Sequence, residues 1–150
     1  MHYRRRLAVP VPLEETFGYL SRFSSAAEWD PSVRSAGMLS PEPVRLGSTF
    51  ALDTVFMGRT VSLRYQISEY DPPRRVVLVA HNSSVRSTDE ITVSTDSSDR
   101  TVVEYRAELA LKGAARLATP VFALMFRRIG DRAADGLLTT LTARSLGAEA

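Results

Sequence analysis

The sequence has no cysteine, and its only histidines are His2 and His81. Without cysteine the chain forms no disulfides, Cys-ligated zinc sites or iron–sulfur clusters, and it offers no thiol nucleophile. Two histidines are too few for a multi-histidine metal site. Neither a nucleophile elbow nor a glycine-rich phosphate loop is present. We therefore expect no metal, no cofactor and no bound nucleotide.

Long hydrophobic runs and a large excess of charge are also missing. No stretch reaches the roughly 18 apolar residues that a membrane-spanning helix needs. The formal net charge is only +2, and acidic residues alternate with the arginines, so the chain lacks the basic stripe of a nucleic-acid-binding protein. The cluster Arg4-Arg5-Arg6 is followed by Pro10 and Pro12, which interrupt any signal-peptide core. We expect a cytoplasmic protein with no nucleic-acid partner and no integral membrane association.

The length of 150 residues and the 44% hydrophobic content fit one globular domain that covers residues 1–150. Alternating apolar and polar residues predict antiparallel strands through most of it. The first strand covers residues 2–9, and two more flank Gly58-Arg59, a pair suited to a two-residue hairpin turn. This turn places Phe56 opposite Val61, with both apolar sets on one face. Further strands are predicted from 75 to 80 with Tyr70 opposite Arg75, through Ile91 and Val93, and from 102 to 111.

Helical spacing appears in three segments. Residues 13–20 and 24–29 predict two short helices after the first strand. Residues 114–146 predict one long amphipathic helix, with Pro120 expected to kink it about two turns in. Gly130 and Gly136 on this helix suggest that packing or a ligand requires small residues there. An antiparallel sheet with one apolar face, covered by this helix, gives an α+β fold.

Asp89 is the one carboxylate that the predicted register turns toward the apolar face. Pairing Val93 with Val103 places Asp89 opposite Ala107. A buried carboxylate raises its pKa or takes a partner, and Arg5 on the first strand is the candidate partner. Three interpretations stay open: a structural pair, a bulge that turns Asp89 outward, and an anchor or general acid for a ligand.

Two features are expected at the surface. His81 falls on the outer face of the sheet in the predicted register. The segment 117–126 is apolar almost all round. It either seats against the rim of the sheet or leaves Leu117 and Leu124 exposed to a dimer partner or a membrane surface. Both a monomer and a homodimer are compatible with this pattern.

Several short motifs follow the predicted elements: Pro12 with Glu14-Glu15-x-Phe17, Trp29-Asp30-Pro31 with Val33, Leu46-Gly47-Ser48, Glu69-Tyr70-Asp71-Pro72-Pro73-Arg74-Arg75-Val76 and Thr101-Val102-Val103-Glu104-Tyr105. In this order they resemble the START-related helix-grip (SRPBCC) superfamily, in its polyketide cyclase/dehydrase and lipid-transport branch, over nearly the whole chain. The resemblance implies a curved seven-stranded antiparallel sheet wrapped around the long C-terminal helix, with a hydrophobic cavity between them. Family members bind lipids, polyketides, quinones, sterols or hormones, and only some are enzymes. The family supplies no catalytic residue that transfers to this chain.

We therefore expect the domain to bind or transport a small-to-medium hydrophobic ligand between the sheet and the C-terminal helix. The alternative is a metal-free aromatase/cyclase or dehydratase that uses the same cavity. Two titratable groups facing each other would favour the enzyme, and the sequence offers Asp89 alone. The candidate ligand-binding residues are Phe50, Leu52, Phe56, Leu63, Tyr65, Ile67, Leu78, Asp89, Ile91, Tyr105, Ala107, Met125, Ile129 and Ala133.

Overall fold

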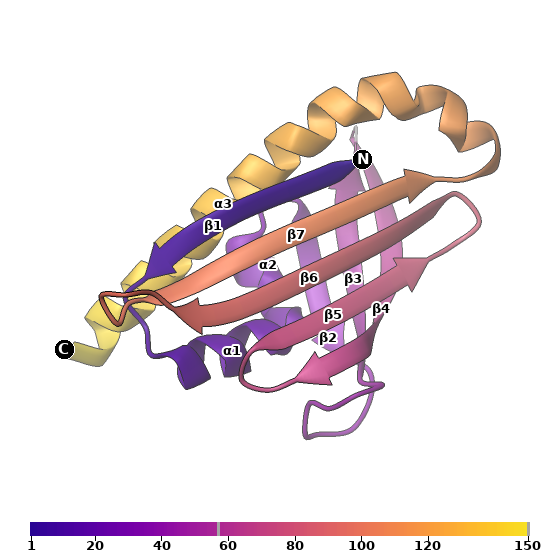
Figure 1. Cartoon of the computed structure of the whole chain (residues 1–150). Coiled ribbons are helices and arrows are strands. Elements are labelled where there is room, and N and C mark those ends of the chain that lie inside the picture. Colours follow the sequence, from indigo (N-terminus) through magenta and orange to yellow (C-terminus); the bar gives the residue numbers. More distant parts are fainter. Residues whose placement is uncertain (57, 150) are drawn as a thin grey trace.

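The computed structural model describes residues 1–56 and 58–149. Within them, seven strands form one antiparallel sheet in the order β1-β7-β6-β5-β4-β3-β2, which curls around a long C-terminal helix (Figure 1). The strands are β1 (His2–Val9), β2 (Val33–Met38), β3 (Thr49–Phe56), β4 (Arg59–Asp71), β5 (Arg75–His81), β6 (Val85–Thr95) and β7 (Thr101–Leu111). The helices are α1 (Leu13–Ser21), the 3-10 turn η1 (Phe23–Ser25), α2 (Ala26–Trp29), the 3-10 turn η2 (Gly113–Ala118) and α3 (Thr119–Glu149). The expected α+β helix-grip fold is confirmed.

The core fills the concave face of the sheet. Because side chains alternate along a strand, every second residue of the central strands points inward. Phe50, Ile67, Leu78 and Ile91 are among the largest side chains that are fully buried there. α1, α2 and the C-terminal half of α3 cover them, as the apolar face of the sheet requires.

The β3–β4 hairpin differs from its predicted register by two residues. Phe56 lies opposite Arg59 and not opposite Val61, so the turn comes before Arg59. Gly58 in this turn has a φ angle of 76°, which glycine adopts without the steric cost of a Cβ. A shift of two residues leaves every side chain on its predicted face, since direction repeats with a period of two. Alternation alone therefore does not distinguish these two registers.

The predicted pairing of Tyr70 with Arg75 is also wrong, by one residue. Tyr70 lies opposite Val76 because the register shifts between Ile67 and Glu69. A bulge of this kind inserts one residue into one strand and bends it. β5 keeps its predicted inner face.

α3 begins later than the sequence predicts. Residues 113–118 form η2, and α3 starts at Thr119. Pro120 thus lies in the first helical turn, where its missing N–H leaves no hydrogen bond unmade, and it does not kink the helix two turns in. The deeply buried side chains of α3, Ala133, Ala134, Leu137 and Leu141, all lie in its later turns.

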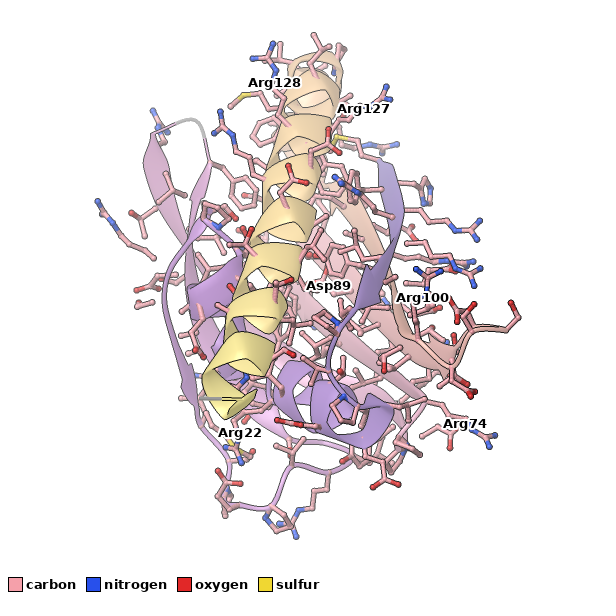
Figure 2. All side chains as sticks on the ribbon, turned by 90° about the vertical axis from the view of Figure 1, so that its left-hand side faces the viewer. Arg22, Arg74, Asp89, Arg100, Arg127 and Arg128 are labelled. Atoms are coloured by element: carbon pink, nitrogen blue, oxygen red, sulfur yellow. The ribbon has the colours of Figure 1, made fainter. Side chains whose placement is uncertain are left out.

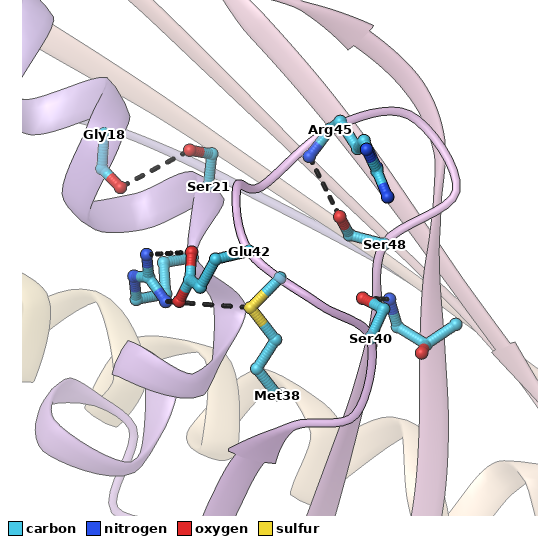
Figure 3. Close-up of polar contacts among 9 residues, drawn as sticks. Gly18, Ser21, Met38, Ser40, Glu42, Arg45 and Ser48 are labelled. Carbon is cyan, nitrogen blue, oxygen red and sulfur yellow. Dashed lines mark hydrogen bonds and ion pairs between the residues drawn. The ribbon is translucent and has the colours of Figure 1, made fainter.

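The loop between β2 and β3, residues 39–48, is fastened at the end of the sheet that lies away from the start of α3 (Figure 1). Arg22, just after α1, forms an ion pair with Glu42 in this loop. The backbone N–H of Arg45 donates a hydrogen bond to Ser48 Oγ at 2.9 Å (Figure 3). The ion pair ties the loop to the end of α1, and the hydrogen bond stabilises the turn within the loop.

Candidate functional site

A cavity of about 50 Å³ lies between the concave face of the sheet and α3. Seven of the predicted ligand-binding residues line it: Leu52, Phe56, Tyr65, Asp89, Tyr105, Ala107 and Ile129. The other seven do not line it in this conformation, and their part in binding stays a prediction. Phe50, Leu63, Ile67, Leu78, Ile91 and Ala133 pack in the surrounding core, and Met125 is half-buried on α3.

Asp89 lies where the predicted register places it. Val93 pairs with Val103, and Asp89 pairs with Ala107. The Asp89 side chain is inside the protein, between the sheet and α3, and the residue is only 5% exposed (Figure 2). The alternative of a bulge that turns Asp89 outward is therefore wrong.

The partner of Asp89 is a tyrosine from the neighbouring strand. The Tyr105 hydroxyl donates a hydrogen bond to Asp89 Oδ1 at 3.2 Å. The predicted partnership with Arg5 is wrong, because the Arg5 guanidinium lies 3.0 Å from Asp135 and 3.8 Å from Asp131 on α3. β1 is an edge strand, so the long Arg5 side chain reaches past the edge to the helix and not across β7 to β6.

Burial controls the protonation of Asp89. Burial raises its pKa to about 7, the Tyr105 hydrogen bond lowers it in part, and the nearby charge of Asp30 raises it. Desolvation and a like charge both disfavour the carboxylate, whereas a donated hydrogen bond favours it. Near neutral pH the carboxyl of Asp89 therefore exists in both forms and can either donate or accept a proton.

Asp30 is a second carboxyl in the cavity wall, and sequence reasoning missed it as a site residue. It follows α2 directly, and its Oδ1 accepts hydrogen bonds from the backbone N–H of Ser32 at 2.9 Å and from Ser32 Oγ at 2.7 Å. Burial raises the pKa of Asp30, and the two bonds from Ser32 lower it in part. The segment Asp30-Pro31 predicts only the end of a helix, because a loop has no alternation from which a direction could be derived.

Two tyrosines complete the polar part of the wall. The Tyr65 hydroxyl donates to Ser87 Oγ at 2.9 Å, and Ser87 precedes Asp89 by two residues on the same face of β6. Burial, followed by the charge of Asp89, raises the pKa values of Tyr65 and Tyr105 well above the usual 10. Both phenols therefore remain protonated donors. Continuing the alternation of Ile91 back along the strand would have identified Ser87.

Aromatic neighbours fix the positions of these two tyrosines. The ring of Tyr105 meets that of Trp29 edge to face, with centroids 5.9 Å apart, and Tyr65 meets Phe23 in the same way at 5.0 Å. Edge-to-face geometry is favourable for aromatic pairs. η1 and α2 thus hold the hydroxyl groups in place beside Asp89. His81 lies on the exposed outer face, as predicted, and takes no part in this site.

A family model matches residues 2–144, and it describes polyketide cyclase/dehydrase and lipid transport proteins. No curated protein matches the chain. The fold is similar to that of a protein from Thermus thermophilus, with a TM-score of 0.77, 16% identity and 100% of each chain covered. It is also similar to the Zhui aromatase/cyclase from Streptomyces sp. R1128, with a TM-score of 0.74, 16% identity, and 97% of this chain and 93% of that chain covered. A START superfamily protein from Mycobacterium smegmatis gives a TM-score of 0.68 at 13% identity, with 94% and 99% covered. At these identities the similarity shows the fold alone.

Proposed function

The chain belongs to the polyketide cyclase/dehydrase and lipid transport family, and we propose that it binds a hydrophobic ligand with a polar head group between the sheet and α3. The observation that supports this most directly is the group of Asp89, Tyr105, Tyr65 and Ser87 on the sheet side of a cavity whose remaining lining is largely apolar. Burying ionisable groups in a core costs free energy, so their presence suggests a function. Hydrogen bonds to the head group of a ligand would be such a function. The apolar walls supply affinity, and the polar group sets orientation.

The cavity must enlarge to admit such a ligand. Its volume of about 50 Å³ holds at most a few water molecules, whereas sites for drug-sized ligands measure about 300–1,000 Å³. Phe126 and Ile129 form the α3 side of the cavity, and both are only half-buried. The first turns of α3 therefore make the fewest buried contacts of the cavity wall, and moving them outward costs the least free energy.

The polar wall favours a ligand that carries a carbonyl or hydroxyl group. Protonated Asp89 donates to a carbonyl oxygen, and its carboxylate accepts from a hydroxyl. Ser87 Oγ accepts the hydrogen bond from Tyr65, and its own hydroxyl hydrogen adds a donor on the same wall. A ligand without polar atoms would leave these buried groups with fewer partners than water provides.

The second carboxyl favours one alternative function, an aromatase/cyclase or dehydratase. In a dehydration, one carboxylate removes the proton from the carbon beside a carbonyl, and one carboxylic acid protonates the hydroxyl group that leaves as water. Asp30 and Asp89 both line the cavity and both have raised pKa values. Conversion of a β-hydroxy ketone to its conjugated enone, followed by absorbance and lost in Asp89→Asn, would support the enzyme over the binding protein.

Binding is tested with a fluorescent hydrophobic probe, 1-anilinonaphthalene-8-sulfonate, and with native mass spectrometry of the purified protein for a co-purified ligand. Ala107 lines the cavity, and Ala110 on the same strand is exposed. We expect Ala107→Leu to weaken probe binding by about tenfold or more, because the added side chain fills the cavity. Ala110→Leu is the matched control and keeps the parent affinity. Absence of probe binding by the parent protein, or an equal loss in both variants, would contradict the proposal.

A further inference from the structure

Large apolar side chains are exposed where β7 leads into α3. Leu117 is 88% exposed, Val121 53% and Leu124 77%. The spacing of three residues places Val121 and Leu124 on one side of α3, and Leu117 precedes them in η2. Exposed leucine and valine side chains gathered at the start of one helix are unusual for a surface that meets only water.

The same segment is strongly basic. Between Glu108 and Asp131 the sequence has no acidic residue, and its four cations are Lys112, Arg116, Arg127 and Arg128. Arg127 and Arg128 lie on either side of α3 near its start (Figure 2). Asp131, the next acidic residue, is contacted from β1, by the Tyr3 hydroxyl at 2.8 Å and the Arg5 guanidinium at 3.8 Å.

We propose that residues 112–128, called the α3 tip below, dock on the surface of an anionic lipid bilayer. Exposed leucines beside arginines are the pattern with which helices bind in the interface plane, with apolar side chains below the head groups and cations at the phosphates. No helix among the described residues is long and apolar enough to cross a membrane, so the contact is with the surface. A second copy of the chain fits less well, because a two-fold contact brings two sets of four cations together.

The α3 tip also connects the surface to the interior. Phe122 packs on Phe56, with ring centroids 6.5 Å apart, and Phe126 lines the cavity. A bilayer that holds Leu117 and Leu124 therefore acts on the same turns that must move outward to admit a ligand. This last step rests on the proposed function, whereas docking itself does not.

The test is co-sedimentation with vesicles of phosphatidylcholine alone and of phosphatidylcholine mixed with phosphatidylglycerol. We expect binding to the mixed vesicles only, and weaker binding as salt rises. The double variant Arg127→Glu/Arg128→Glu should bind at least about 25-fold more weakly, since each arginine near an anionic surface contributes about fivefold. The double variant Arg45→Glu/Arg74→Glu makes the same charge change on two exposed arginines and should bind like the parent. Arg45 lies in the β2–β3 loop, at the end of the sheet away from the α3 tip (Figure 1), and Arg74 also lies far from the tip (Figure 2).

The apolar part is tested separately with Leu117→Ser/Leu124→Ser. Because both leucines are exposed, this variant should fold normally, keep probe binding in the cavity and lose vesicle binding. Equal binding to both vesicle types, no binding at all, or equal losses in the two arginine double variants would overturn the proposal. A dimer in solution that this leucine variant abolishes would identify a second copy as the occupant. Vesicle binding without probe binding would instead contradict the proposed function and leave docking intact.

Discussion

The backbone carbonyl oxygen of Trp29 lies so close to Gly136 that a Cβ atom on this residue would clash with it. α2 and α3 therefore approach each other through their backbones, which only glycine permits. Earlier on α3, a Cβ on Gly130 would come within 2.6 Å of the Tyr3 ring. The sequence left open whether packing or a ligand requires these two glycines. The structure supports packing.

Gly136→Ala should destabilise the protein by about 1–3 kcal/mol, because the methyl group forces α2 and α3 apart. The matched control is Gly18→Ala in α1, where an added Cβ meets nothing within 4 Å. That substitution should be neutral or stabilise by up to about 1 kcal/mol, since alanine is the better helix former. Chemical denaturation of both variants measures the difference. Equal effects at the two positions would show that α2 and α3 do not approach this closely.

Asp89 should make the protein less stable as the pH rises through neutrality. In the unfolded chain its carboxyl ionises near pH 4, and burial raises its pKa in the folded protein to about 7. Between these values the folded protein holds more protons than the unfolded chain. The free energy of unfolding therefore falls from about pH 4 to about pH 7, by an amount on the order of 3 kcal/mol, and then levels off.

Asp89→Asn isolates this contribution from that of other carboxyls. The amide keeps the shape and still accepts the Tyr105 hydrogen bond, but it never ionises. The variant should match the parent near pH 4 and be more stable than the parent at pH 8, as chemical denaturation at the two pH values would show. A variant less stable than the parent at both values would instead indicate a buried charge pair that the substitution breaks.

The alternation of apolar and polar residues predicted the direction of Asp89 but not its hydrogen-bond partner. The pairing of Val93 with Val103 fixes the direction of Asp89, because two strands with one buried face tolerate no shift of a single residue. The partner of Asp89 is not fixed in this way. Arg5 lies two strands away from Asp89 across the sheet, and its direction depends on α3, whose position no strand pattern contains.

Asp30 shows the other limit of sequence reasoning. Its place in the cavity wall depends on how the turn after α2 packs against the sheet, and this is set by contacts between residues far apart in the chain. The register of the β3–β4 hairpin is also decided by tertiary contacts, since two registers that differ by two residues bury the same faces. In both cases the deciding interaction is tertiary. Local patterns predicted the elements and faces, and packing decided the pairs.

The first turns of α3 should open more readily than the rest of the helix. Backbone amides of residues 121–129 are expected to exchange hydrogen at least about tenfold faster than those of residues 133–141, because only the later turns carry deeply buried side chains. Hydrogen exchange followed by mass spectrometry resolves the two segments. A bound ligand should slow exchange in residues 121–129. Uniform protection along α3 would mean that the cavity opens elsewhere.

Removing the Tyr105 hydroxyl should raise the pKa of Asp89 above about 7, because the hydrogen bond from Tyr105 is the interaction that lowers it. Tyr105→Phe keeps the ring that packs against Trp29, so the fold around the site is preserved. Tyr65→Phe is the control, since the Tyr65 hydroxyl donates to Ser87 and not to Asp89. Titration of the Asp89 carboxyl carbon by NMR gives the pKa in each variant. A rise in Tyr105→Phe alone identifies the phenol of Tyr105 as the group that stabilises the carboxylate. A rise of equal size in Tyr65→Phe would mean that the loss of any nearby hydroxyl has this effect, and that Tyr105 has no specific role in setting the charge of the cavity.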